Sequence, residues 1–574
     1  MTSTKIVCLL ATTVLACAGL TAANAAPVPH RHPPAAHRHK ADPRDQRIAA
    51  LEAEVSALTT IVAGLQQRPA ASVAADNTRG TSPTGSGQLA LNTTAGGPAN
   101  GSTANTGDAS PPATSPDQTR PVTSSVPGPS AAGATILAGK PSIQSGDGRF
   151  VANLHSTMQF DAADYIQNQA GPVATDLRRA GAAAETSRAR NLASGTNFRR
   201  ARIGIDGKVF GDVDYNVLFE FGGAGLEDAG HIQELWLQYT GIKPFRFRVG
   251  AFPPSYGLED QGSTNGMLFL ERPAIADITR SVAGGDFREA GQLVASDNKR
   301  WFANIALTTR IVGVANAASL ASAPSFNQSF GGIARVAVLP LVGDDTLIHL
   351  GAHGSRVFKV ADTGGPDVAL AGRYPVNFQE RAELRVDGTR LIATGAINAA
   401  HVNTIGAEAI AQKQQFMVQG EYEQITVERL ASALSNPHFS GWYVEGSWVL
   451  TGERRKYNTG TFAVDAPTVD HPFDARHGTY GAFELAARYS VTNLNYNAGS
   501  VGTATPADGI RGGKQSIVTA GLNWYLNPIV RFMFDYQHVQ IDHLSPNAAT
   551  FLTPVGADIG QRYDVISLRS QLAF

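Results

Sequence analysis

Hydrophobic and polar residues alternate with a period of two along residues 561–574, the segment that closes the chain. One parity is mainly apolar and the other is polar: Ile566, Leu568, Ser570, Leu572 and Phe574 against Ser567, Arg569 and Gln571. Residues of opposite parity lie on opposite faces of a β-strand. A strand with an apolar outer face, a polar inner face and a terminal aromatic residue is typical of a bacterial outer-membrane barrel, although an edge strand of a soluble sandwich is also compatible with it.

The same alternation recurs from about residue 148 onward. In residues 150–162 the even positions include Phe150 and Phe160, whereas the odd positions include Gln159 and Asp161. Four further segments repeat the pattern: 215–221, 483–489, 518–524 and 530–537. Because a soluble antiparallel sheet also alternates, this pattern by itself leaves a soluble β protein possible.

The pattern predicts sixteen strands, an even number that allows a bacterial barrel to close and that suits a porin with an aqueous lumen. They are expected at residues 149–165, 197–209, 212–222, 231–240, 244–252, 287–296, 300–309, 330–340, 345–359, 401–411, 414–429, 439–452, 479–491, 514–526, 529–541 and 561–574. No stretch after the N-terminal segment reaches the ~18 uninterrupted apolar residues of a helical membrane span. We therefore expect an all-β fold, a 16-stranded antiparallel transmembrane β-barrel over residues 148–574, in the outer membrane of a Gram-negative bacterium.

Three of the expected connections are much longer than the others. Residues 253–286 and 361–400 are expected on the external side, and residues 452–478 on the periplasmic side, where turns are normally short. Long ordered loops usually carry function. Folded into a lumen, these segments would narrow it.

Residues 1–25 have the features of a secretory signal peptide. Lys5 precedes an apolar run that ends at Leu20, and small residues before position 26 allow cleavage. Cys17 follows a passable lipobox, so lipid attachment is the alternative. Because Cys8 and Cys17 both precede the expected cleavage site, the mature chain would contain no disulfide and no cysteine-based metal site or nucleophile.

Three segments separate this signal from the expected barrel. Residues 26–47, rich in His, Arg and Pro, predict a solvated basic extension, with a metal-binding tract as the alternative. Residues 48–66 carry a heptad seam with apolar spacings of three and four: Ile48, Leu51, Val55, Leu58, Val62 and Leu65. They predict a short coiled coil, which becomes stable when the rest of the protein already holds several chains together. The alternative is an isolated amphipathic helix. Residues 67–147, almost without large apolar side chains, predict a disordered linker of Ala, Gly, Ser, Thr and Pro. This region is expected in the periplasm, with possible contact to the cell wall.

Six motifs stand in order between residues 199 and 528. They are Arg199-Arg200-Ala201-Arg202, Val249 to Glu259, Phe269 to Arg272, Trp442 to Trp448 with Thr451 to Arg454, Phe483 to Tyr489, and Gly521 to Pro528. With these motifs the chain from about residue 199 to 574 resembles the phosphate-selective porin O and P family. The resemblance implies a homotrimer of sixteen-stranded barrels, with the third and fifth external loops and one periplasmic turn folded inward. It also implies a channel lined by an arginine ladder and a lysine cluster. Arg200, Arg202 and Arg272 match the motifs, whereas no lysine cluster can be placed.

Passage of anions requires cationic side chains that face water and are spaced so that an ion moves on without being trapped. Guanidinium groups suit phosphate because they donate paired, charge-assisted hydrogen bonds. Parity and motif position select ten candidates for the anion path: Arg200, Arg202, Arg246, Arg248, Arg272, Arg454, Arg455, Arg488, Arg531 and Arg569. The alternative for any one of them is a salt bridge across the wall, with Glu220, Glu234, Glu484 and Asp535 as available partners.

Composition and motifs argue against other classes of protein. We find no G-x-S-x-G, no H-E-x-x-H and no complete P-loop, since Gly509–Lys514 lacks the Ser or Thr that must follow the lysine. A net charge of −1 carries no nucleic-acid signal. We therefore expect no enzyme, no cofactor and no metal, but a porin in contact with outer-membrane lipid that takes up phosphate or related small anions passively. The alternative is a general diffusion porin with weak selectivity, whose N-terminal coil also tethers the cell envelope.

Overall fold

The computed structural model describes residues 133–137, 140–167, 191–222, 230–283, 286–312, 326–546 and 555–574. All of them belong to one unit of the chain, Arg120–Phe574. The expected signal peptide, basic extension and coiled coil lie outside the described residues, and so does most of the expected linker. No helix among the described residues has the length and apolar character required to cross a membrane.

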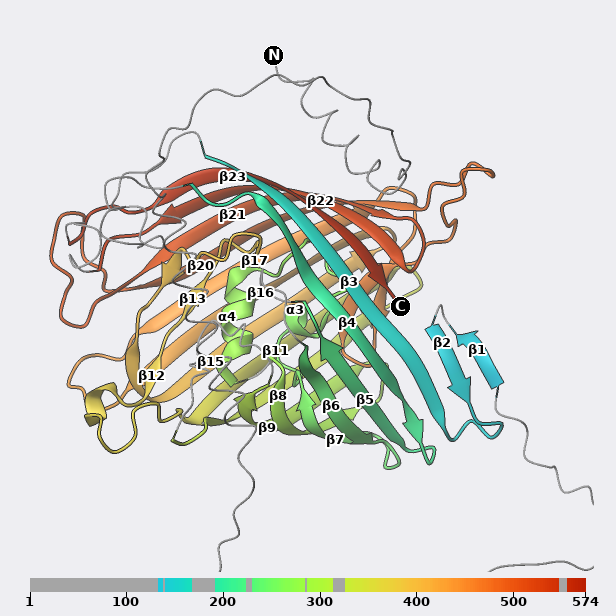
Figure 1. The fold of residues 1–574 in the computed structure, drawn as a ribbon, viewed down its shortest axis with the longest axis horizontal. Helices are drawn as coiled ribbons and strands as arrows, with labels where there is room; N and C mark the ends of the chain where they lie inside the picture. Colours follow the sequence, from blue (N-terminus) through green and yellow to red (C-terminus); the bar gives the residue numbers. More distant parts are fainter. Residues whose placement is uncertain are drawn as a thin grey trace, which may run out of the picture. The chain divides into compact units, whose positions relative to one another are not determined.

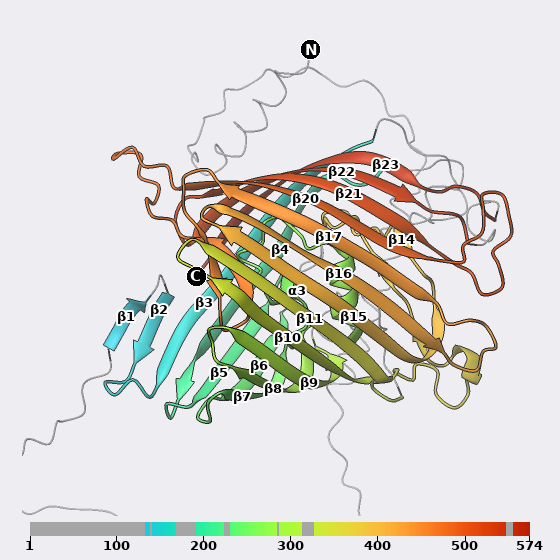
Figure 2. The same ribbon diagram turned by 180° about the vertical axis from the view of Figure 1, so that it is seen from behind.

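Sixteen antiparallel strands form a closed barrel (Figures 1 and 2). In chain order they are β3 (Val151–Ile166), β4 (Gly195–Val209), β5 (Val213–Glu220), β6 (His231–Tyr239), β7 (Phe245–Phe252), β8 (Arg288–Ser296), β9 (Trp301–Ile311), β10 (Phe330–Val342), β11 (Thr346–Lys359), β15 (Ile397–Lys413), β16 (Phe416–Arg429), β17 (His438–Val449), β20 (Ala482–Tyr496), β21 (Ile510–Tyr525), β22 (Val530–Asp542) and β23 (Gln561–Ala573). Each strand pairs with the next, and β23 pairs with β3 to close the sheet. The expected fold class and strands are confirmed, although β15 and β21 begin earlier than expected, at Ile397 and Ile510.

The two faces of the sheet differ as the alternation requires. Phe160, Leu485 and Phe534 point outward and remain 38%, 43% and 40% exposed, whereas the adjacent Asp161 and Glu484 point inward and are fully buried. An apolar outer face suits the hydrocarbon of a bilayer. The inner face is polar yet buried, so its side chains need hydrogen-bond partners inside the barrel.

Three connections fold into the barrel and supply those partners. They are loop L3 (residues 253–287), loop L5 (residues 360–396) and turn T6 (residues 450–481). Loop L3 contains α3 (Leu258–Gln261) and α4 (Ala274–Ala283); loop L5 contains the short helix η5 (Leu370–Gly372) and the strands β12 (Pro375–Val376), β13 (Gln379–Glu380) and β14 (Ile392–Ala393); turn T6 contains β18 (Arg455–Asn458) and β19 (Ala463–Pro467). Figure 1 shows α3 and α4 inside the ring of strands. The inward folding implied by the family resemblance is thus present at all three expected places.

Helix α4 is the largest element inside the barrel, and all of its residues are buried. Ile275, Ile278 and Val282 recur at helical spacing and join one apolar cluster with Phe378 of loop L5. A helix this short is marginal in water, so packing must stabilise it. On β17, a Cβ added at Gly441 would lie 2.7 Å from the Cβ of Ile275, so glycine is what allows α4 to approach the wall this closely.

Two short strands precede the barrel, β1 (Gly133–Leu137) and β2 (Lys140–Gln144), and form an antiparallel hairpin. Residues 142–144 of β2 pair with residues 151–153 of β3 and so extend the sheet. This hairpin corrects the linker expected over residues 67–147, whose last part belongs to the sheet. Each strand has only five residues, and glycine and proline among them gave the segment the composition of a linker.

Candidate functional site

A polar cavity of about 300 Å³ lies between loop L3 and the barrel wall. The strands β4, β6 and β7 supply one side and loop L3 supplies the other, with Arg385 of loop L5 and Thr461 of turn T6. Its charged lining residues are Arg199, Arg200, Arg202, Arg248, Arg272, Arg280 and Arg385 with Glu234, Asp260, Asp277 and Asp286. Arginines therefore outnumber carboxylates on the surface that a solute would meet.

Three of these arginines, Arg200, Arg248 and Arg272, have no carboxylate within 4.0 Å among the described residues. The Nη1 group of Arg200 donates to the amide oxygen of Gln159 at 2.5 Å. The Nε group of Arg272 donates to the carbonyl oxygen of Glu259 at 3.1 Å. Neutral acceptors thus hold these side chains in place, and their positive charge remains uncompensated by a direct ion pair.

Arg248 is held by an amide and an aromatic ring. Its Nε group donates to Gln238 at 3.0 Å, and its guanidinium carbon lies 4.0 Å from the centre of the Trp236 ring, a cation–π contact. Glu234 accepts hydrogen bonds from Asn216 and Trp236 at 2.9 and 2.8 Å, so it brings a carboxylate to the same cavity without pairing with Arg248. The direction of Arg248 is therefore fixed while its charge stays available to an ion.

The other four lining arginines form ion pairs: Arg199 with Glu271, Arg202 with Glu220, Arg385 with Asp277 and Glu271, and Arg280 with Asp260, Asp277 and Asp286. Arg199 and Arg385 share Glu271 of loop L3 as a partner. Burial disfavours its ionised form, but Arg199, Arg385 and Arg569 hold the pKa of Glu271 well below its usual range. These pairs fix loops L3 and L5 against β4, and they offer less free charge to a passing ion.

Arg199 faces the lumen because of a β-bulge in β4. Simple alternation of inward and outward residues along the strand would not predict this bulge. Gln159 pairs with Arg200, and Phe160 pairs with Phe198, so Arg199 is the extra residue of β4. Arg199 and Arg200 are adjacent, yet both are buried on the inner face. Bulges re-aim side chains in this way and are common near functional sites. The only signal for it in the sequence is the doubled arginine itself.

A sequence profile of the phosphate-selective porin O and P family matches residues 175–574. The chain belongs to this family. It is 23% identical to Porin O of Pseudomonas aeruginosa over 366 residues, 62% of this chain and 79% of that protein. It is 26% identical to an uncharacterized protein of Caulobacter vibrioides over 352 residues, 60% of this chain. The match spans 63% of the Caulobacter protein, less than two thirds of its length.

Solved outer-membrane barrels are also similar to this porin. An anion-selective porin from Comamonas acidovorans aligns with a TM-score of 0.41 at 11% identity, over 74% of this chain and 99% of that one. OmpT of Vibrio cholerae aligns with a TM-score of 0.41 at 9% identity, over 74% of this chain and 98% of that one. Family and barrel together indicate an outer-membrane channel rather than an enzyme.

Four of the expected anion-path arginines donate hydrogen bonds to backbone carbonyl groups of loop L3. Arg455 donates to Gly266, Arg531 to Asn265 and Met267, Arg569 to Leu270 and Arg488 to Glu271. Three of them also pair with carboxylates: Arg455 with Glu484, Arg488 with Glu383 and Glu445, and Arg569 with Asp161 and Glu271. Each of the four is at most 3% exposed. The structure gives them a role in positioning loop L3 that parity could not foresee.

The two remaining candidates are at turn T6. Arg246 of β7 donates to the carbonyl oxygen of Gly460 in turn T6 at 3.0 Å. Arg454 of turn T6 donates to the carbonyl oxygen of Asp344 at 2.8 Å. Neither residue lines the cavity beside loop L3.

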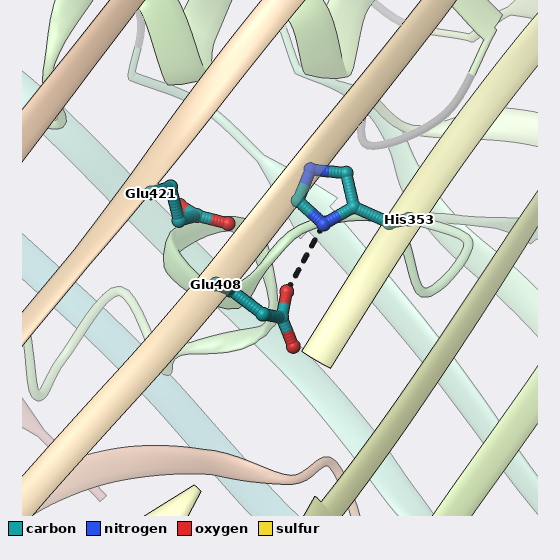
Figure 3. Close-up of side chains that lie close together, drawn as sticks. All are labelled: His353, Glu408 and Glu421. Carbon is teal, nitrogen blue, oxygen red and sulfur yellow. Dashed lines mark hydrogen bonds and ion pairs between the residues drawn. The ribbon is translucent and has the colours of Figure 1, made fainter. Parts of the chain in front are cut away.

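A second buried polar cluster, on β11, β15 and β16, was not anticipated from the sequence. Figure 3 shows the side chains of His353, Glu408 and Glu421 close together. Their ligand-type atoms lie within 4.8 Å of one another. All three already have protein partners, because His353 bonds Glu408 and Glu423 at 3.1 and 2.7 Å, and Glu421 accepts the N–H of Leu258 at 2.5 Å. This cluster therefore works as a hydrogen-bond network that holds loop L3.

Proposed function

We propose that this porin passes small anions, phosphate among them, down their concentration gradient. The observation that carries the proposal is the set of three arginines, Arg200, Arg248 and Arg272, that line the cavity beside loop L3 without a carboxylate partner among the described residues. Membership of the phosphate-selective porin O and P family supports phosphate as a substrate.

The physical argument concerns the strength of each contact. An ion crosses a channel quickly when it binds several weak sites in turn rather than one strong site. In a throat from which much water is excluded, a charge acts at a lower effective dielectric constant than on the open surface. Three guanidinium groups held by neutral partners supply attraction of this kind, and each can donate paired hydrogen bonds to a phosphate or carboxylate.

The alternative is a general diffusion porin with weak selectivity. Carboxylates on the same lining, among them Glu234 and Asp260, favour this alternative because they repel anions. Current through single channels of the full-length protein in planar bilayers decides between the two. In a potassium chloride gradient the sign of the reversal potential should show preference for chloride, and added phosphate should block the chloride current.

Variants locate the site. Replacing Arg200, Arg248 or Arg272 by glutamine should weaken phosphate block about tenfold, equivalent to ~1.4 kcal/mol for one charged hydrogen-bond donor. Arg476→Gln, an exposed residue of turn T6, is the matched control and should leave block unchanged. Preference for cations in the wild type, or unaltered block in all three cavity variants, would overturn the proposal in favour of the general porin.

We further propose a homotrimer embedded in outer-membrane lipid, with the N-terminal region in the periplasm and in contact with the cell wall. The family resemblance and the heptad seam of residues 48–66 support trimerisation. Heat-resistant trimers of a barrel lacking residues 26–132 would assign assembly to the barrel. Trimers formed only by the full chain would assign it to the coil.

A further inference from the structure

We propose that the cavity beside loop L3 selects small organic anions that also carry hydroxyl or ammonium groups. This inference rests on the proposed function and narrows it, from anions in general to anions that donate hydrogen bonds. It follows from polar atoms of the lining that have no partner, rather than from the arginine charges alone.

Arg280 of α4 holds two aspartates by one oxygen each. Its Nε group donates to Oδ1 of Asp260 and its Nη1 group to Oδ1 of Asp286, both at 2.5 Å. The second oxygen, Oδ2, of each aspartate has no hydrogen-bond partner among the described residues. Both aspartates are more than nine-tenths buried, and both line the cavity. Two residues of the lining thus each keep one covered carboxylate oxygen that the protein does not use.

The same lining offers unused donors. The Nε group of Arg200 and the Nη1 group of Arg385 also lack hydrogen-bond partners in the described part of the chain, whereas Nε of Arg385 lies 3.4 Å from Glu271. Both side chains are 3% exposed and line the cavity. With Arg248 and Arg272, these groups form the part of the lining that attracts an anionic group.

Buried polar groups without partners are unfavourable, so water or a passing solute must satisfy them. An ion that only accepts hydrogen bonds satisfies the arginines but is repelled by Asp260 and Asp286. A solute with an anionic group and a hydroxyl or ammonium group satisfies both kinds of lining. Sites that hydrogen-bond a hydroxyl discriminate strongly against analogues that lack it, because the site's own groups are then left unpaired.

Two phosphate monoesters of equal charge and similar size test the inference. Glycerol 3-phosphate carries two alcohol hydroxyl groups, and n-propyl phosphate carries no alcohol hydroxyl group. In planar bilayers containing the full-length protein, glycerol 3-phosphate should block the chloride current at a concentration about tenfold lower. Asp260→Asn and Asp286→Asn should bring the two blocking concentrations together, while block by inorganic phosphate persists or strengthens because a negative charge is lost. Asp474→Asn, in the exposed part of turn T6, is the control and should keep the wild-type ratio.

The wild-type comparison needs no variant and is therefore independent of any folding defect. Equal block by the two esters in the wild type, or an unchanged ratio in both asparagine variants, overturns this inference. If inorganic phosphate still blocks, the proposed function stands. A third outcome is that none of the three anions blocks, that the wild-type channel prefers cations, and that the asparagine variants lose this preference. The aspartates then form a cation path, and the proposed function itself fails.

Discussion

Arg335 on β10 forms a completely buried ion pair with Glu408 on β15, with Nη2 2.8 Å from Oε1. The two strands are not neighbours, because β11 lies between them in the sheet. The same guanidinium donates to the carbonyl oxygens of Thr461 and Phe462 in turn T6, at 2.8 and 2.7 Å. One arginine therefore joins two strands of the wall to turn T6, which folds into the barrel.

Arg335→Met should destabilise the barrel by up to about 3–5 kcal/mol, because the buried Glu408 loses its arginine and keeps His349 and His353 as partners. Urea unfolding in lipid vesicles, followed by tryptophan fluorescence, measures the change. Turn T6 should also loosen, and single-channel conductance should rise. The control is Arg356→Met, which removes a pair to Glu428 whose side chains are 40% and 36% exposed. An exposed pair contributes about 0–1 kcal/mol, so equal losses in the two variants would contradict this account.

Glu421 anchors the start of α3, because its carboxylate accepts the N–H groups of Leu258 and Glu259 at 2.5 and 3.1 Å. Glu421→Ala leaves both N–H groups without that acceptor, so amide hydrogen exchange of residues 257–262 should become about tenfold faster. Glu289→Ala, which removes an exposed carboxylate paired with Arg310, is the control. Unchanged exchange in the Glu421 variant would mean that other contacts suffice to hold loop L3.

Strand positions could be read from the sequence because the rule that sets them is local. Each apolar outward residue such as Leu485 stands beside a polar inward one such as Glu484, and a period of two is visible in any short window. Contacts across the lumen join residues that are far apart in the sequence, so no short stretch of sequence reveals them. Parity identifies Arg569 as inward, but its partner, the carbonyl oxygen of Leu270, lies 299 residues away along the chain.

The part of the candidate site that lies on the strands could be predicted from local alternation, whereas most of the part on the loops could not. Arg200, Arg248 and Arg272 were all among the ten candidates, since parity and motif position suffice to place a side chain in the lumen. Whether such an arginine meets an ion or a carboxylate depends on how loops L3 and L5 fold. Arg385 and the two aspartates held by Arg280 were missed, because loop residues follow no alternation.

The bulge at Arg199 can be tested by deletion. Removing one of the two adjacent arginines should restore simple alternation in β4, so that Phe198 stays outward and the remaining arginine stays inward. The variant should fold, since Glu271 keeps Arg385 and Arg569 as partners. Heat-modifiable migration in electrophoresis reports folding. Deleting Ala201 instead should move Arg202 toward the lipid face, at a cost of about 2–4 kcal/mol near the membrane midplane, and lower the folded yield. Equal yields would argue against a fixed bulge.

Transport should be passive. The sequence contains no complete P-loop, so we expect no coupling of transport to nucleotide hydrolysis. Liposomes that contain only this protein should take up labelled phosphate until the inner and outer concentrations are equal. Accumulation above that level would contradict diffusion, and protein-free liposomes control for leakage.

The heptad seam remains a prediction, because residues 48–66 lie outside the described structure. A peptide of residues 44–68 should form trimers at high concentration, as measured by sedimentation equilibrium. Replacing Val55 and Leu58 by aspartate should abolish them, since charges in an a/d seam oppose its burial, while the barrel of the full chain carrying both changes should still fold. A wild-type peptide that stays monomeric at millimolar concentration would show the seam to be accidental.

The hairpin β1–β2 has a consequence for how the barrel closes. Strand β23 pairs with β3 down to Thr157, and Phe574 exchanges backbone hydrogen bonds of 3.0 Å with Ser156. Since β4 occupies the other edge of β3, β2 at residues 151–153 must lie on the same edge as β23, just beyond Phe574. It acts as an end stop, because β23 cannot slide further toward that end without displacing β2. A slip of one residue would turn Ser567, Arg569 and Gln571 toward lipid. The barrel closes where β23 pairs with β3, and it must select the register of that pairing. The hairpin β1–β2, which is not part of the barrel, therefore helps to fix this register.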